Sequence, residues 1–283
     1  MQPLLVVTLL SSLSTPALAQ DDRADFSAAD QATEEVEAPQ TDLAAELGGA
    51  LVTGNAVSYA LNASLAFAHT WTENKLTIGA GANYAAGKVD SDAGGSLDAT
   101  ERAAAAQVLT RKVQGDLRYD RYLTDKDALY VWAGGLHDPF AGYDARVHEQ
   151  LGYARALVKS EHSHLGVEIG FDWAEEFFVD PQTSGNDLLE SSTTYENVLA
   201  GRVGVSLSHD FNENVSVSDE ANTYVNVISP ADVRVLNTAS ISSKLSDVFS
   251  LKLSNQLTFD NVPVEGFRKL DETTLVTFVA SIF

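Results

Sequence analysis

Apolar and polar residues alternate with a period of two over most of the chain after residue 43. In the stretch 165–173 the odd positions are apolar, while the even positions hold Gly, Glu or Asp. The same alternation runs through 57–67, 203–208 and 249–259. Because successive side chains of a strand point to opposite faces, this period predicts β-strands with one apolar and one polar face. No apolar run in this part approaches 18 residues, so no transmembrane helix is expected.

The connections between these strands alternate in length. Short turn clusters of Asn, Asp, Ser, Thr, Glu or Lys alternate with longer polar loops, which lie at 89–100, 137–144, 180–192 and 261–270. The predicted strands are 43–52, 56–69, 75–87, 103–122, 128–137, 145–158, 164–178, 195–210, 215–228, 233–245, 249–260 and 271–283. Short turns on one side and an even antiparallel count predict an all-β fold: a transmembrane antiparallel up-and-down β-barrel of about 12 strands.

The polar face of these strands decides between this barrel and a soluble all-β sandwich or lipocalin-like barrel. A packed soluble core rarely holds many charges, whereas a wet lumen does. The alternating runs are also mostly ten residues or longer, as a tilted membrane strand requires. We therefore predict a lumen lined by charged residues, and the candidate lumen-facing residues are Lys112, Asp116, Arg118, Glu168, Asp172, Arg202, Glu220 and Lys252.

Aromatic residues gather toward the two ends of the predicted strands and suggest two membrane-interface bands. The band near the short turns would hold Phe67, Trp71, Tyr119, Tyr122, Tyr130, Trp132, Phe211 and Phe249. The band near the long loops would hold Tyr84, Phe140, Tyr143, Trp173, Phe177, Phe178, Tyr195 and Phe259.

The N-terminal region has a different composition. Residues 1–19 have an apolar stretch and a small-x-small Ala17-Leu18-Ala19 site, which predict a signal peptide for export. Residues 20–42 are strongly acidic and poor in large apolar residues, so we expect a disordered segment or, alternatively, a docking tail for a basic partner. The barrel domain would be 43–283. The formal net charge of -22 argues against nucleic-acid binding, and the absence of cysteine excludes disulfides and Cys-based metal sites.

Three segments carry a family resemblance. The stretch LGGALVTGN at 47–55, the run at 119–155 and a last strand ending in Phe283 resemble the salt-induced outer-membrane protein family, a domain of unknown function. The resemblance departs at 147–150, where a glycine-rich strand is expected. It implies an outer-membrane barrel with no established catalytic residues. The terminal Phe resembles the signal by which the barrel-insertion machinery recognises its substrates.

The search for chemistry gives little. His162 and His164 flank a short turn without a third ligand type at a fixed spacing, so no metal site is predicted. No nucleophile motif such as G-x-S-x-G is present, so we expect no enzyme and no cofactor, and a lipid hydrolase is the weakest alternative. Asp138, Asp144 and Arg146 could form an ion-pair clamp or simply anchor the loop base.

The long loops carry mostly acidic residues, namely Asp90, Asp92, Asp98, Asp138, Asp144, Asp180, Asp187, Glu190, Asp260, Glu265 and Asp271. Such a rim would concentrate cations. The leading hypothesis is therefore a Gram-negative outer-membrane pore for small solutes or cations, linked to a salt or envelope response. The alternative is a non-conducting barrel whose acidic loops bind divalent cations at the lipopolysaccharide surface. The expected partners are outer-membrane lipid and lipopolysaccharide; the oligomeric state is left open.

Overall fold

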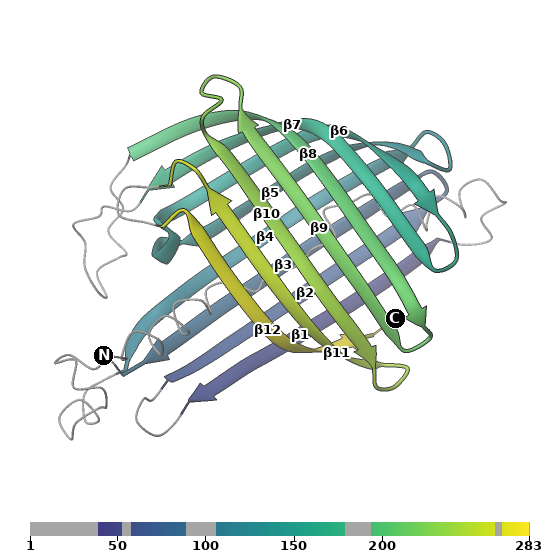
Figure 1. The fold of residues 1–283 in the computed structure, drawn as a ribbon, viewed down its shortest axis with the longest axis horizontal. Helices are drawn as coiled ribbons and strands as arrows, with labels where there is room; N and C mark the ends of the chain where they lie inside the picture. The colour runs from purple at the N-terminus through teal and green to yellow at the C-terminus, as the bar shows by residue number, and fades with distance from the viewer. Residues whose placement is uncertain (1–38, 53–57, 89–105, 179–193, 264–267, 283) are drawn as a thin grey trace.

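The fold is a closed barrel of twelve antiparallel strands, seen in a computed structural model that describes residues 39–52, 58–88, 106–178, 194–263 and 268–282 (Figure 1). The strands are β1 (Gln40–Val52), β2 (Ser58–Trp71), β3 (Asn74–Gly87), β4 (Gln107–Tyr122), β5 (Asp127–Asp138), β6 (Tyr143–Lys159), β7 (Ser163–Phe178), β8 (Thr194–Asn212), β9 (Val215–Asn226), β10 (Val233–Lys244), β11 (Phe249–Asp260) and β12 (Leu270–Ser281). A single 3-10 turn, η1 (Pro139–Ala141), lies between β5 and β6. The prediction of a twelve-stranded all-β barrel is confirmed.

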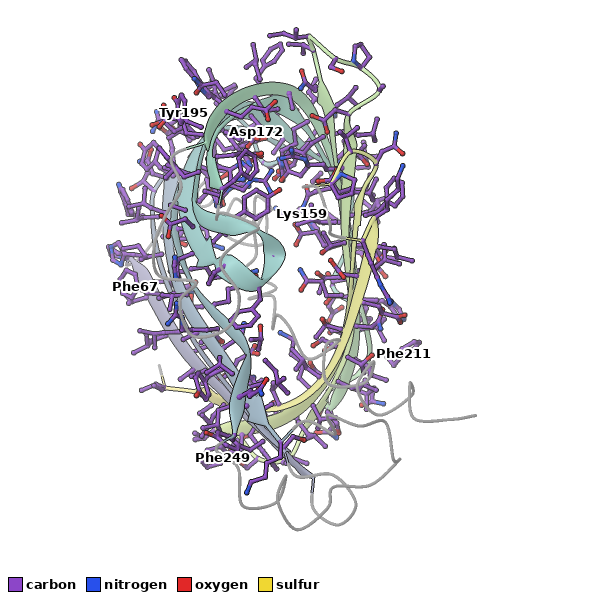
Figure 2. The ribbon with its side chains drawn as sticks, turned by 90° about the vertical axis from the view of Figure 1, so that its left-hand side faces the viewer. Phe67, Lys159, Asp172, Tyr195, Phe211 and Phe249 are labelled. Carbon is purple, nitrogen blue, oxygen red and sulfur yellow. The ribbon has the colours of Figure 1, made fainter. Side chains whose placement is uncertain are left out.

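Each strand pairs with its neighbours in the sequence, and β1 pairs with β12 to close the ring. Figure 2 looks along the barrel from the end that carries η1 and shows an oval cross-section. The long connections lie at this end, which we call the long-loop end; the opposite end is the short-turn end. Among the described residues, no helix has the length and hydropathy to cross a bilayer.

The predicted strand boundaries hold to within a few residues. The largest differences are at β4, predicted from residue 103 and observed from Gln107, and at β1, predicted from Leu43 and observed from Gln40. Strand β1 starts earlier because Gln40, Thr41 and Asp42 continue the register with β2, and the Thr41 hydroxyl lies 2.8 Å from His69 Nδ1. The predicted signal peptide and most of the acidic segment lie outside the described residues.

Two of the short connections, β2–β3 and β8–β9, are two-residue turns. At the β8–β9 turn the Asn212 side-chain oxygen accepts hydrogen bonds from the backbone N–H groups of Asn214 and Val215, at 2.9 and 3.0 Å. At the β2–β3 turn Thr72 has φ of 30°. A positive φ is uncommon for a residue with a side chain. Polar residues at these positions therefore satisfy or tolerate the tight reversals that the alternating strands require.

The alternation along each strand separates two environments. On β7 the even positions Asp172 and Glu176 are buried, while the odd positions Ile169, Phe171 and Trp173 are each more than half exposed. Similar apolar side chains cover the outer wall on β2, β4, β5, β6 and β8. A wall that exposes Leu, Val, Ile and Phe outward and buries charges inward suits lipid outside and polar groups within.

The aromatic bands are present only in part. Outward-pointing rings meet at both ends, as in the contact of Trp71 with Tyr119 at 6.3 Å and of Phe177 with Tyr195 at 5.0 Å. Figure 2 shows Phe67, Phe211 and Phe249 on the outer wall. The assignment of Tyr122, Tyr130, Trp132 and Tyr143 to the bands was wrong. These four side chains point inward: the first three share the even phase of Arg118 and Asp120 across the register, and a bulge next to Tyr143 turns that ring to the lumen.

Candidate pore lining

A chain of charged side chains crosses the lumen from β4 to β9, and we call it the central network. Arg118 on β4 donates to both carboxylate oxygens of Asp120, at 2.8–3.0 Å, and to Glu168 on β7 at 2.8 and 3.3 Å. Glu168 also accepts a 2.6 Å bond from Arg202 on β8. Strands β5 and β6 separate β4 from β7, so these side chains can meet only inside the barrel.

Asn222 and Glu220 on β9 extend the central network. Arg202 donates to the Asn222 side-chain oxygen at 2.7 Å, and the Asn222 amide donates to Glu220 at 2.7 Å. Arg118 and Arg202 are each only 1% exposed in their side chains. Charges buried to this degree are stable only when they are paired and hydrogen bonded, which is the arrangement observed.

Tyr130 on β5 lies at the centre of this network. Its hydroxyl accepts a 2.6 Å bond from Arg202, and the Arg118 guanidinium lies 4.2 Å from its ring centroid, a cation–π geometry. Two glycines, one on the adjacent strand β6 and one on β7, make room for the ring. A Cβ at Gly170 would lie 2.8 Å from the Tyr130 hydroxyl, and one at Gly152 would overlap the ring. The glycines at these inward positions are therefore required by the aromatic side chain.

A second group of charges, the loop-end cluster, lies nearer the long-loop end. Glu176 on β7 pairs with Arg146 on β6 at 3.0 Å and with Arg234 on β10. Arg234 also lies 3.2 Å from Asp260 and 3.6 Å from Asp232. Glu176 is 1% exposed, so it is a buried carboxylate held by two guanidinium groups. The cluster joins strands that do not pair in the sheet, because β8 and β9 separate β7 from β10.

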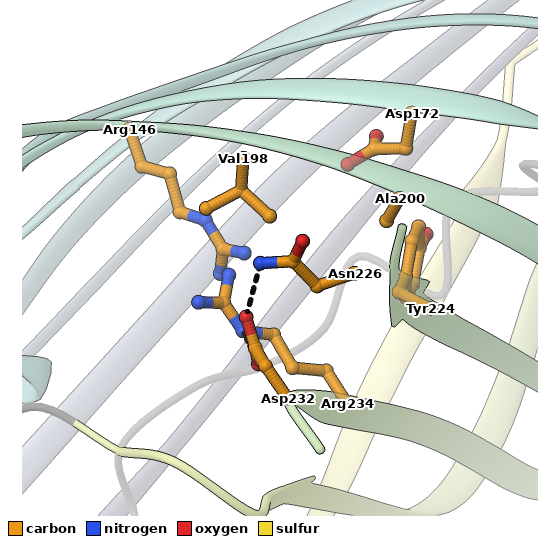
Figure 3. A pocket seen from close by; sticks show the side chains of 8 residues that line it. All are labelled: Arg146, Asp172, Val198, Ala200, Tyr224, Asn226, Asp232 and Arg234. Atoms are coloured by element: carbon orange, nitrogen blue, oxygen red, sulfur yellow. Dashed lines mark hydrogen bonds and ion pairs between the residues drawn. The ribbon is translucent and has the colours of Figure 1, made fainter. Parts of the chain in front are cut away.

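A small cavity lies beside this cluster (Figure 3). It has a volume of about 10 Å³, about the space that one water molecule needs. In Figure 3 the guanidinium groups of Arg146 and Arg234 lie close together, and Asp232 accepts a 3.0 Å bond from the Asn226 amide. The remaining lining side chains are Asp172, Val198, Ala200 and Tyr224. These side chains leave only this small space between them.

The structure places all eight candidate lumen-facing residues on the inner face. Arg118, Glu168, Arg202 and Glu220 belong to the central network. Asp172 lies 3.0 Å from His148 Nδ1, and Lys252 on β11 lies 2.9 Å from Glu46 on β1. Lys112 is the register partner of the buried Asn83, and Asp116 is the register partner of the buried Gly79.

The three predicted loop-anchor residues each make a different contact. Asp138 caps η1 by accepting a 3.1 Å bond from the Ala141 backbone N–H. The Asp144 carboxylate lies 3.7 Å from His137 Nδ1. Arg146 reaches across to Glu176 in the loop-end cluster. The three residues are therefore brought to one region, but Arg146 serves the lumen and not a local clamp.

Several residues that the structure shows with partners in the lumen were not among the predicted lumen-facing residues. They are Glu46, Asp120, Tyr130, Glu176, Asn222 and Arg234. Phase along the strand was the available signal for Glu176, which follows Asp172 by four residues on β7, and for Asp120, which follows Arg118 by two on β4. The partners themselves come from distant strands, and alternation carries no information about them.

A contrast in burial divides the lumen into two sides. On β7 the inward Glu168, Asp172 and Glu176 are buried. On β10 the inward positions are only half-buried along most of the strand, namely Arg234, Leu236, Thr238, Ser240 and Ser242. The inward Glu220 on β9 and Gln256 on β11 are also half-buried. We call the inner face of β9–β11 the open side, because most of its inward side chains are more exposed than those of β7.

Catalytic and metal-binding arrangements have little support among the described residues. No group of three or more His, Asp or Glu is placed to hold a metal ion there. Ser163 Oγ lies 2.8 Å from His209 Nδ1, a pair that the sequence did not predict. An activated serine also needs a third group that orients the histidine, and within the described part of the chain His209 makes no hydrogen bond to an acid or amide.

Much of the predicted acidic rim lies outside the described residues: Asp90, Asp92, Asp98, Asp180, Asp187, Glu190 and Glu265. Four members are described. Asp138 is buried at η1, Asp144 and Asp260 are half-buried, and Asp271 is exposed on β12. The described carboxylates therefore lie at the long-loop end as expected, although Asp138 and Asp260 have partners inside the barrel.

Comparison with known proteins gives one family and several folds of the same kind. The family model described as "Protein of unknown function, DUF481" matches residues 45–282. No curated protein matches the sequence. The chain is similar to a NanC porin structure, with 10% identity over 85% of this chain and 100% of that one, at a TM-score of 0.47. It is also similar to the translocator domain of autotransporter NalP from Neisseria meningitidis, with 12% identity over 91% and 93% and a TM-score of 0.46.

Proposed function

The chain belongs to the DUF481 family of proteins of unknown function, and from the geometry of its lumen we propose that it is an outer-membrane pore for small solutes, with cations preferred. Closed barrels with an apolar outer wall are the β-structures that cross membranes, and bacterial outer membranes are where single-chain barrels of this kind occur. The proposed partners are outer-membrane lipid and lipopolysaccharide.

The observation that carries the proposal is the open side. Barrels of eight strands are filled by side chains, while those of 16 to 18 leave a water channel, so twelve strands allow an intermediate, narrow path. The central network fills the lumen beside β4–β8, and the half-buried Thr238, Ser240 and Ser242 leave space along β10. Small hydroxyl side chains can exchange hydrogen bonds with a hydrated ion.

The preference for cations follows from the charges beside this path. Glu220 is half-buried on the open side, and Asp271 adds an exposed carboxylate at the long-loop end. The bases Lys252 and Arg234 on the same side are both paired: Lys252 lies 2.9 Å from Glu46, and Arg234 belongs to the loop-end cluster. Carboxylates in a narrow lumen concentrate cations and repel anions. The proposed link to a salt response rests on this selectivity and on the family resemblance.

Planar bilayers test the proposal. Folded protein is inserted from detergent, and current is recorded under a KCl gradient. We expect stepwise current and a reversal potential that is shifted from zero toward the equilibrium potential of potassium. A silent bilayer with correctly folded protein, shown by heat-modifiable gel mobility, would contradict the pore; a clear chloride preference would contradict the selectivity.

One observation favours a second candidate, a non-conducting barrel whose acidic loops bind divalent cations at the lipopolysaccharide surface. The central network and the loop-end cluster together tie β4 to β10 across the lumen, as a structural plug would. This candidate predicts no current and a loss of thermal stability when a chelator removes divalent cations. The two measurements therefore separate the candidates.

A further inference from the structure

The seam that closes the barrel is incomplete. Residues 44–48 of β1 pair with residues 277–281 of β12. Beyond that point β1 continues to Val52 in register with β2 only, and the first half of β12 is in register with β11 only. Residues 49–52 of β1 and the main chain at Glu272, Thr274 and Val276 of β12 therefore lie beyond the last β1–β12 register pair. Figure 1 shows β1 and β12 diverging toward the long-loop end.

The divergence begins at a pair of glycines. Gly48 is the last residue of β1 that pairs with β12, opposite Thr277, and Gly49 is the first that does not. A Cβ at Gly48 would lie 2.6 Å from the Asn62 side chain and 3.0 Å from Thr277 Cγ2. A side chain at this position would therefore displace Asn62 on β2 and press on Thr277. Glycine inside a strand also weakens pairing and permits a bend.

The outer wall beside the open edge is polar. The Asn255 amide on β11 donates to Glu272 and to Thr274 on β12, both at 2.9 Å. Glu272 and Thr274 share the outward phase of Val276 and Phe278, which are 55% and 60% exposed. Asn255 lies midway along β11 between the outward Phe249 and Phe259. This polar group therefore interrupts the apolar outer face of β11 between Phe249 and Phe259.

The same residues present main-chain groups to the gap. Ile282 donates its backbone N–H to the Leu43 carbonyl across the seam at 2.8 Å. The backbone N–H and C=O groups of a strand point to alternate sides from one residue to the next. The main-chain groups of Val276, Thr274 and Glu272 therefore point toward β1, as those of Ile282 do. Unpaired main-chain groups are strongly unfavourable in hydrocarbon, so such backbone is found only against protein or water. A carboxylate, an amide and a hydroxyl at the edge would hold that water.

We propose that the long-loop half of the β1–β12 seam is a lateral portal. Through it an amphiphile with a cationic head and an apolar chain passes between the lumen and the adjoining leaflet. The portal rests on the proposed pore and gives it a second opening and a substrate class.

The rim favours a cationic head because it offers mainly acceptors. Both N–H groups of the Asn255 amide are engaged by Glu272 and Thr274, and no Lys or Arg lies among the described outward residues of β11 and β12. The apolar chain would lie against the exposed side chains beside the fork, which include Leu47 and Leu61 at 64% and 58% exposure.

Cysteine pairs test the geometry, since the chain contains no cysteine. Continuing the register would place residue 51 opposite residue 274. We expect L51C/T274C to form no spontaneous disulfide in vesicles, while A45C/A280C, which joins true register partners, forms one. A hydrophilic maleimide should label T274C but not I169C, an outward position on the fully paired β7. An efficient 51–274 disulfide together with an unlabelled T274C would overturn the portal.

Transfer of an amphiphile tests the use of the portal. Vesicles with the L51C/T274C protein receive a fluorescent amphiphile with a dodecyl chain and a trimethylammonium head, or dodecyl sulfate as the anionic control. Protein-dependent transfer of the cation should be lost after a short bis-maleimide links the two cysteines, while potassium current remains. Transfer that survives linking, or that is equal for dodecyl sulfate, would overturn the proposal. Loss of current with the geometry intact would contradict the pore alone.

Discussion

Arg118 and Glu168 meet across the lumen through two hydrogen bonds, at 2.8 and 3.3 Å, although β5 and β6 lie between their strands. The pair is buried, and Glu168 is shared with Arg202 at 2.6 Å. Glu168 is therefore shared by two buried guanidinium groups, and of these Arg118 is also paired with Asp120. This arrangement makes Glu168 the residue on which the central network depends most.

Replacement of this carboxylate should be costly. We expect Glu168→Gln to lower the free energy of unfolding by about 3–5 kcal/mol, because removing one partner of a buried pair leaves uncompensated charge. Urea unfolding in detergent, followed by tryptophan fluorescence, measures the change. The control is Glu73→Gln, which removes a half-exposed partner of Arg121 at the β2–β3 turn and should cost about 0–1 kcal/mol. Equal effects of the two substitutions would show that the network adds nothing to stability.

Adding a side chain at position 170 should also destabilise the barrel. A Cβ there would lie 2.6 Å from the Leu151 carbonyl and 2.8 Å from the Tyr130 hydroxyl. We expect Gly170→Ala to destabilise the barrel by about 1–3 kcal/mol, as overpacking does. Gly201→Ala on β8 is the matched control, since a Cβ there meets no atom within 4 Å. Thermal unfolding of the two variants by circular dichroism should therefore differ, and a stable Gly170→Ala variant would show that Tyr130 moves aside easily.

Two neighbouring acidic residues on β9 lie on opposite faces of the barrel wall and allow the charge of each face to be tested separately. Glu220 points inward and accepts from Asn222, while Asp219 points outward and accepts from Asn237 at 2.8 Å. We expect Glu220→Gln to shift the reversal potential under a KCl gradient toward zero, because a fixed negative charge beside the path is lost. Asp219→Asn should leave the reversal potential unchanged. If Asp219→Asn had the larger effect, ions would not pass along the open side.

A bulky side chain on the open side should obstruct the pore. Ser240 on β10 is half-buried in the lumen, and its hydroxyl lies 2.8 Å from that of Ser218 on β9. We expect Ser240→Trp to reduce single-channel conductance several-fold, because the indole would occupy the hydrated space. Ile241→Trp places the same ring on the outer wall, where Ile241 is 43% exposed, and should conduct normally. Normal current through both variants would place the path elsewhere.

Alternation predicted the barrel, the strand count and the placement of polar residues on one face. This was possible because each strand reports its own two faces, as β7 does with Asp172 inside and Phe171 outside. The same rule could have placed Tyr130 inside, since it pairs with Asp120 across β4 and β5. The aromatic residue type was given more weight than its phase, and the assignment to an interface band was therefore wrong.

Contacts between distant strands could not be predicted in this way. The bond from Arg234 to Glu176 depends on the oval shape of the barrel, which brings β10 toward β7, and no local pattern encodes that shape. The incomplete seam is a similar case. Residues 49–52 and 270–276 read as ordinary strand, and only the register of the closed ring shows that they do not meet.

The seam also sets the order in which the barrel can assemble. Every pairing except that of β1 with β12 joins strands that follow one another in the chain, so hairpins can add one after another with little loop to close. Joining the two ends is the one long-range step, and it carries the largest entropy of loop closure. Since this last junction is held by a short stretch of pairing next to glycines, the finished barrel should open first where it closed last.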